Sequence, residues 1–155
     1  MIVVGFDLSH TRAGVVGLYW GGKWTVKLVF SNVISLGGMK SAKVYGRALD
    51  ALWASTVKVP GESIDSAVIE RIPQGELMGC ARGVLEKRNI PYILISSTQT
   101  KKLVGGSGKA SKADIAKVVR ERFGIEFPGD EGLGSDLYDA AGHALVGLSK
   151  KGMPL

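Results

Sequence analysis

Two acidic side chains stand at the ends of short apolar segments. Asp7 follows the apolar run IVVGF, and Glu70 follows the run AVI. An ionised carboxylate among apolar residues costs several kcal/mol unless a cation or a set of hydrogen-bond donors compensates it. We therefore interpret Asp7 and Glu70 as acids that two strands present to a ligand.

A second acidic group lies near the C-terminus in the stretch DLYDAAGH. Asp136, Asp139 and His143 are spaced so that they share one face of a helix. If the strands that end in Asp7 and Glu70 are neighbours, their ends and this helix face can converge. Carboxylates about 4 Å apart repel one another by about 4 kcal/mol per pair at an effective dielectric constant of about 20, so four acids predict a bound cation. Hard oxygen ligands favour Mg²⁺ or Mn²⁺, and two such ions can promote phosphodiester hydrolysis.

Each of these residues also has a structural alternative. Asp136 could cap the last helix, because acids stabilise a helix N-terminus, and Asp139 could lie on its solvated face. Glu70 could pair with the adjacent Arg71. His143 could pack in the core, bind the metal or transfer a proton.

The rest of the pattern predicts the elements that would position these side chains. Apolar, β-branched runs predict strands, and 3.6-residue periodicity predicts helices. We expect strands at 2–7, 13–19, 24–31, 66–69 and 92–95, helices at 40–57, 77–88, 112–123 and 136–148, and a basic helical turn at 98–103. This order predicts an α/β protein whose five-stranded mixed sheet carries helices on both faces. It is typical of a ribonuclease-H-like fold rather than of a doubly wound nucleotide-binding fold.

The composition is that of one globular domain spanning residues 1–155. The single Cys80 excludes an internal disulfide and a cage of cysteines around a metal. The chain has no apolar run near 20 residues and no signal-peptide pattern. We therefore expect a protein of the cytoplasm, bacterial or phage-infected, with no membrane contact.

Basic residues are concentrated in one segment of a chain whose net charge is +6 and whose isoelectric point is near 9.5. Residues 101–122 contain seven of them against two acids, namely Lys101, Lys102, Lys109, Lys112, Lys117, Arg120 and Arg122 against Asp114 and Glu121. Such clustering favours a polyanion, and nucleic acid above all. The loop VGGSGK lacks the Lys-Ser/Thr end of a P-loop, so we interpret it as a flexible loop that lets Lys109 approach phosphates.

Five segments in order resemble the motifs of the RuvC family of Holliday-junction resolvases. GFDLSHTRAGVV is similar to the family's first strand and turn, VIERI to its second acidic strand, and GCARGVLE to the helix that follows. LVGGSGKASKADIAKVVRERF resembles its glycine-rich loop and basic helix, and SDLYDAAGHALVGL its final helix. The resemblance covers nearly the whole chain, with motif order and spacing kept.

The resemblance implies a homodimer that makes paired cuts in four-way DNA junctions. It places the family's four catalytic, metal-binding acids on Asp7, Glu70, Asp136 and Asp139, and two phosphate-holding lysines on Lys101 and Lys112. We add Lys109 and Arg12 as DNA contacts, and His143 as an alternative metal ligand. The implied cofactors are two Mg²⁺ ions, which Mn²⁺ can replace. A branch-migration helicase partner is left open.

The chain also departs from the family pattern. Leu8-Ser9 follows the first acid where Pro-Gly is frequent, which is consistent with a divergent branch, a phage-encoded one among the alternatives. Pro73 stands where many members carry an aromatic residue, and this favours cleavage selected by DNA structure rather than by sequence. Three alternatives stay open: another ribonuclease-H-like nuclease that cuts RNA–DNA hybrids, one that cuts branched DNA in general, and a protein that binds junctions without cutting them.

Overall fold

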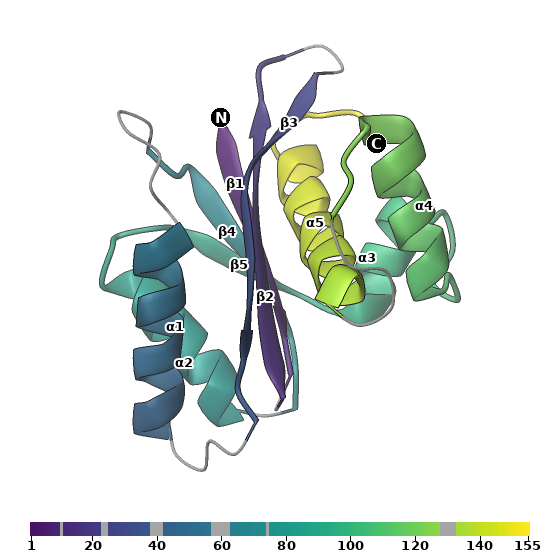
Figure 1. Cartoon of the computed structure of the whole chain (residues 1–155). Helices are drawn as coiled ribbons and strands as arrows, with labels where there is room; N and C mark the ends of the chain where they lie inside the picture. The colour runs from purple at the N-terminus through teal and green to yellow at the C-terminus, as the bar shows by residue number, and fades with distance from the viewer. Residues whose placement is uncertain (10, 23–24, 38–41, 57–62, 74, 128–132) are drawn as a thin grey trace.

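The structure is a computed structural model that describes residues 1–9, 11–22, 25–37, 42–56, 63–73, 75–127 and 133–155 (Figure 1). Five strands and five helices lie along these residues, in the order β1-β2-β3-α1-β4-α2-β5-α3-α4-α5. The strands are β1 (Ile2–Leu8), β2 (Arg12–Trp20), β3 (Val26–Ser35), β4 (Ser66–Glu70) and β5 (Tyr92–Ile95). The helices are α1 (Ala42–Thr56), α2 (Gly75–Glu86), α3 (Ser97–Val104), α4 (Lys112–Phe123) and α5 (Leu133–Lys150).

The five strands form one mixed sheet in the order β3-β2-β1-β4-β5. β1–β2 and β2–β3 are antiparallel, whereas β1–β4 and β4–β5 are parallel. The expected five-stranded mixed sheet is therefore confirmed. Phe6 pairs with Ile69, so the next residues along, Asp7 and Glu70, lie side by side at the same edge of the sheet.

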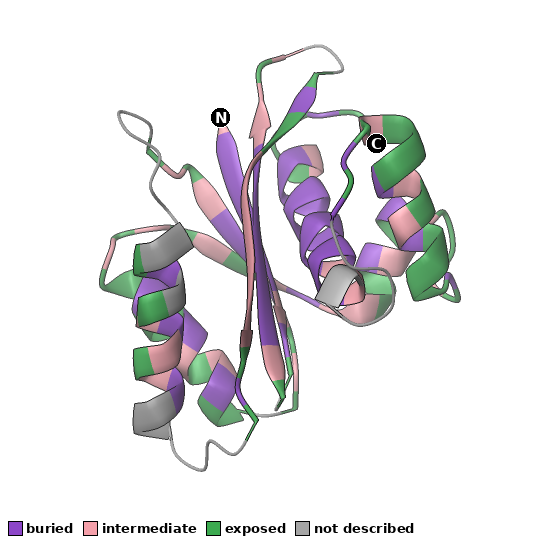
Figure 2. Ribbon diagram, in the orientation of Figure 1, coloured by how far each residue is buried: buried purple, intermediate pink, exposed green. Residues whose placement is uncertain are grey.

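Helices cover both faces of the sheet, with α1 and α2 on one side and α3, α4 and α5 on the other (Figure 1). Successive residues of β1 point to opposite faces. Val4 and Phe6 pack in the core beneath α1 and α2, and Val3 packs in the core beneath α5. Figure 2 shows that β1 and most of α5 are buried. Asp7 has the parity of Val3, so it projects toward α5.

Glycines let α5 lie unusually close to the sheet. A Cβ atom added at Gly5 would overlap the carbonyl oxygen of Ala140, and one added at Gly14 would lie 2.9 Å from the carbonyl oxygen of Asp136. A Cβ at Gly147 would come within 2.5 Å of a side chain of β1. α5 thus contacts the sheet closely at three points, where Gly5, Gly14 or Gly147 leaves no room for a side chain. These contacts fix the position at which the helix crosses the sheet.

Several elements extend beyond their expected bounds, among them β3 and the basic turn. β3 continues to Ser35, because β2 pairs with it through to Arg12. The basic turn expected at 98–103 is a complete helix, α3, and it adds a third helix after β5 to the expected order. Ser96 and Gln99 explain this helix, since they form a capping box that satisfies its first backbone N–H groups.

Several expected features lie outside the described residues. These are the beginning of the strand expected at 24–31 and both ends of the helix expected at 40–57. Among the described residues, no helix combines the length and apolar character that crossing a bilayer requires.

Candidate functional site

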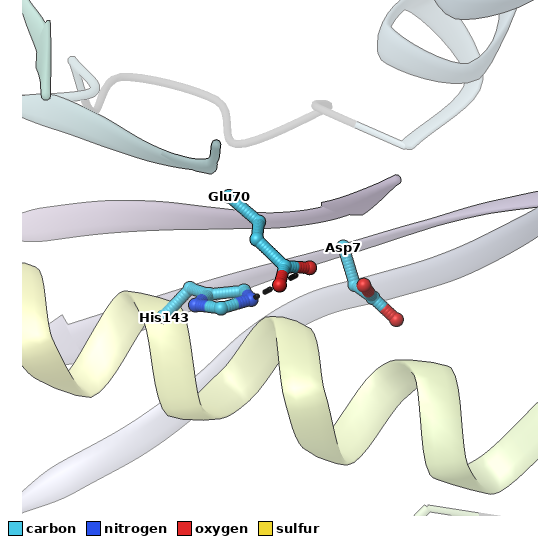
Figure 3. Close-up of side chains that lie close together, drawn as sticks. All are labelled: Asp7, Glu70 and His143. Atoms are coloured by element: carbon cyan, nitrogen blue, oxygen red, sulfur yellow. Dashed lines mark ion pairs between the residues drawn. The ribbon is translucent and has the colours of Figure 1, made fainter. Parts of the chain in front are cut away.

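Three of the predicted site residues converge at one edge of the sheet. Asp7 of β1, Glu70 of β4 and His143 of α5 each offer one ligand atom, and these three atoms lie within 4.8 Å of one another. Figure 3 shows the three side chains meeting between the strand ends and α5. The parallel pairing of β1 with β4 brings the two acids together, and the close crossing of α5 supplies the imidazole.

The imidazole of His143 is held from the side away from the acids. Its Nδ1 is hydrogen-bonded to Thr100 Oγ1 at 2.8 Å, and Thr100 is itself buried on α3. Its Nε2 lies 3.8 Å from Glu70 Oε2 and is buried without a hydrogen-bond partner among the described residues. A histidine that is fixed through one nitrogen and presents the other to a pair of carboxylates has the arrangement of a metal ligand.

The electrostatics of the two strand acids favour the binding of a cation. Burial, which is the largest effect, and the nearby charges of Asp139, Glu70 and Asp136 outweigh the opposing charge of Lys112 and together raise the pKa of Asp7 to about 8. Burial acts in the same sense on Glu70, but the neighbouring imidazole of His143 and carboxyl group of Asp7 bring its pKa below the usual range. Without a cation, Asp7 therefore keeps its proton near neutral pH, whereas Glu70 is ionised. Two oxygen ligands and one nitrogen ligand that are short of positive charge fit a divalent cation.

The three residues line a cavity of about 100 Å³. Asp139, Lys101 and Lys112 also line it. The ammonium of Lys112 lies 2.5 Å from Asp139 Oδ2. Burial lowers the pKa of Lys112, but the ion pair with Asp139 outweighs this effect and the pKa is raised. A carboxylate-lined cavity with two lysines around it can hold a cation and a phosphate together.

Asp136 does not join this group. Its Oδ2 lies 2.7 Å from Arg12 Nε, at the β2 side of the cluster, and only 11% of its side chain is exposed. Asp136 is nevertheless close enough to raise the pKa of Asp7. Lys109 lies in the exposed loop between α3 and α4 and does not line the cavity. The proposed pair of Glu70 with Arg71 is not among the ion pairs of the described residues.

Two residues of the site, Ser97 and Thr100, were not identified from the sequence. Both belong to α3 and line the cavity. The one signal in the sequence is the S-x-x-Q capping box at Ser96, which predicts the start of a helix. Thr100 then lies one turn inside that helix. Nothing local indicates that this turn faces His143.

No family model matches the chain. It is 33% identical over 138 residues to the crossover junction endodeoxyribonuclease RuvC of Anaplasma marginale (strain Florida), an alignment that covers 81% of each protein. It is 26% identical over 156 residues to the protein of the same name from Ehrlichia canis (strain Jake), covering 93% of this chain and 96% of that one. Among solved structures, Thermus thermophilus RuvC in complex with its Holliday junction substrate superposes with a TM-score of 0.72 at 19% identity, covering 100% of this chain and 99% of that one. This last similarity shows a shared fold.

Proposed function

The chain belongs to the RuvC family of crossover junction endodeoxyribonucleases, and we propose that it resolves four-way DNA junctions by metal-dependent hydrolysis of paired phosphodiesters. The observation that carries the proposal is the convergence of Asp7, Glu70 and His143, which are far apart in the chain, within 4.8 Å. The whole of residues 1–155 acts as one nuclease domain in this proposal.

We assign the metal ligands from the geometry of the cavity. Asp7, Glu70 and His143 supply the first group of ligand atoms, and Asp139 on the same wall supplies a fourth. The ions are Mg²⁺, with Mn²⁺ able to replace it, and the number of carboxylates suits two ions. When bound, such ions activate water and stabilise the oxygen that leaves phosphorus. Asp136, predicted from the sequence as a further acid ligand, forms an ion pair with Arg12 beside this group, and its role as a ligand stays a prediction.

The basic residues around the cavity are suited to the DNA backbone. Lys101 and Lys112 line the cavity and can hold the phosphate that is cut. Lys109 extends the positive charge onto the exposed loop, and Arg12 extends it along the end of β2. Binding through phosphates predicts an affinity that falls steeply as the salt concentration rises. Each phosphate contact contributes roughly −0.9 to the slope of log K against log salt concentration.

We also propose that the active species is a homodimer, because symmetric cutting of a junction needs two active sites. The surface best suited to a second copy is the outer side of α2. Gly79 and Gly83 are exposed there, and a Cβ atom added at either would meet nothing within 4 Å. Small residues on an exposed helix face allow another helix to approach closely.

The test is digestion of a synthetic four-way junction with labels on two opposing arms, in the presence and absence of Mg²⁺. We expect symmetric, Mg²⁺-dependent cuts, and little cutting of a linear duplex or of an RNA–DNA hybrid. Asp7→Asn should abolish cutting and leave junction binding intact, whereas Glu126→Gln, an exposed change of the same charge, should cut normally. Preference for the hybrid, or full activity of Asp7→Asn, would refute the proposed function.

A further inference from the structure

A second hollow lies at the opposite end of the sheet from the metal cluster. The first residues of β4 and β5 and the last turns of α5 form it, and its volume is about 120 Å³. We call it the β5 groove. Ser66, which lines it, begins β4, and Glu70 ends the same strand about 13 Å away at about 3.3 Å per residue. The groove is therefore separate from the metal cluster.

The groove exposes an apolar side chain of β5 to solvent. Successive residues of a strand point to opposite faces of its sheet. Leu94 packs toward the core beneath α1 and α2, whereas Ile95 is buried in the core beneath α5. Ile93 lines the groove and has the parity of Ile95, but 37% of it is exposed. The groove approaches the ~150 Å³ of an engineered apolar cavity that binds benzene, so one branched aliphatic side chain fits it.

The backbone of β5 is open along the edge of the sheet. β5 is the last strand in the order β3-β2-β1-β4-β5. The carbonyl oxygens of Pro91 and Ile95 accept hydrogen bonds from β4 at 2.8 and 2.7 Å. Because backbone groups alternate in direction along a strand, those of Tyr92 and Leu94 point away from β4, and no described residue bonds to them. Such an edge can accept a further strand.

β5 is held in place from its other face. The hydroxyl group of Tyr92 accepts a hydrogen bond from Arg82 Nε at 2.7 Å and donates one to Glu86 Oε1 at 2.7 Å. Both partners belong to α2, and the guanidinium of Arg82 also lies 5.8 Å from the centroid of the Tyr92 ring. An edge that is fixed before a partner arrives loses less conformational freedom on binding.

Two cations stand beside this edge. Lys150 and Lys151 line the groove, are exposed, and take part in none of the ion pairs of the described residues. A cation in the last turn of a helix is stabilised by the helix's terminal carbonyl groups, which accounts for Lys150. Lys151 lies beyond the end of α5. The pair is complementary to an occupant that carries carboxylates next to an apolar side chain.

We propose that the β5 groove is a docking site for an extended, acidic segment of another protein. The segment adds a strand to β5, places an apolar side chain against Ile93, and presents carboxylates to Lys150 and Lys151. DNA is the poorer occupant, because a phosphate backbone would meet the two lysines but has no apolar group for the groove. The docking site does not depend on the proposed nuclease activity.

The test is a titration of the isotope-labelled full chain, without DNA or metal, with two synthetic peptides. They are acetyl-Glu-Glu-Val-Thr-Val-Thr-amide and the same residues in reverse order, because a strand can add in parallel or antiparallel. We expect one of them to shift the amide signals of Tyr92 and Leu94 and to slow hydrogen exchange at both amides, while the signal of Asp7 stays unchanged. If neither peptide binds, the proposal is wrong.

An exchange of charges tests the two lysines. Lys150→Glu combined with Lys151→Glu should weaken binding about 10-fold, because each exposed pair of charges changes from attraction to repulsion. A peptide with lysines in place of its glutamates should show the reverse order of affinities. Lys27→Glu combined with Lys117→Glu is the matched control, since it reverses two exposed lysines outside the groove. Equal losses in the two double variants would contradict a specific site.

Changes in the peptide test the groove and the strand edge. Serine in place of both valines should weaken binding about 10-fold, because no apolar side chain is left for the groove. Backbone N-methylation of both valines and of both threonines is compared in two further peptides. Only the amides on one side of an added strand bond to β5, so one peptide should lose binding and the other should keep it. Equal binding of the two would exclude strand addition.

Two other results would assign the groove differently. If Lys150→Glu with Lys151→Glu weakens binding of a labelled four-way junction as much as that of the peptide, the lysines contact DNA. If the peptide at saturation changes the sedimentation of the protein from dimer to monomer, the groove joins two copies of the chain. Either result overturns the proposal. A protein that binds the peptide but does not cut junctions contradicts only the proposed function, so the two failures are distinguishable.

Discussion

Removing the carboxylate of Asp7 should stabilise the protein when no divalent ion is present. The pKa of this group is about 8 in the folded chain, against 3.8 for a free aspartate side chain. Because the folded state holds the proton more tightly, the contribution of Asp7 to stability is fully present below pH 3.8 and is lost as the pH rises toward 8. The amide side chain that Asp7→Asn introduces cannot ionise, so this variant escapes the loss.

The magnitude follows from the same shift. At about 1.36 kcal/mol for each pH unit, ionisation of Asp7 removes at most about 4 kcal/mol from the free energy of unfolding at pH 7. For a domain of this length, such a difference corresponds to a change of about 10 °C in melting temperature. The gap between Asp7→Asn and the unmodified protein should therefore widen by about 4 kcal/mol between pH 5 and pH 8.

Thermal and urea unfolding in a chelating buffer from pH 5 to pH 8.5 measure this gap. Adding Mg²⁺ should then stabilise the unmodified protein and leave Asp7→Asn almost unchanged, because only the intact cluster binds the ion. Glu126→Gln controls for net charge and should show no such pH-dependent gap. A gap that does not change with pH, or a variant less stable than the unmodified protein at pH 8, would refute the electrostatic reasoning.

Three further perturbations test other parts of the structure. Thr100→Val removes the 2.8 Å hydrogen bond to His143 and should weaken divalent-ion binding about 10-fold in calorimetry, while unchanged affinity would contradict the role given to the imidazole. Gly5→Ala forces a methyl group into the backbone of α5 and should lower the free energy of unfolding by about 3 kcal/mol in urea titrations, and a neutral effect would show that α5 can shift. Gly83→Arg should convert the proposed dimer to monomers in sedimentation experiments without changing Mg²⁺ binding.

Local patterns in the sequence were enough to predict most of the strands and helices and to identify the two acids at the strand ends. The apolar runs that end at Asp7 and Glu70 are the strands β1 and β4, because alternation and β-branched content depend only on neighbouring residues. The shared face of Asp139 and His143 on α5 is also a local property, set by the helical repeat.

Local patterns underestimated α3, which was expected only as a turn. Its eight residues lack a wide apolar stripe, so periodicity showed only a basic turn there. The capping box at Ser96 and the cations Lys101 and Lys102 in its last turn stabilise it instead. Its packing against α5 brings Thr100 to His143, a contact between segments distant in the chain.

The tertiary structure alone decided which residues of the α5 face meet the strand acids. Three polar side chains of one helix face could each have approached Glu70, and the choice depends on where α5 crosses the sheet. The close contacts at Gly5 and Gly14 set that crossing, so His143 lies beside Glu70 and Asp136 lies beside Arg12. The spacing of residues along the chain shows which side chains share a face of α5. The packing of α5 against the sheet determines which strand residue each of those side chains contacts.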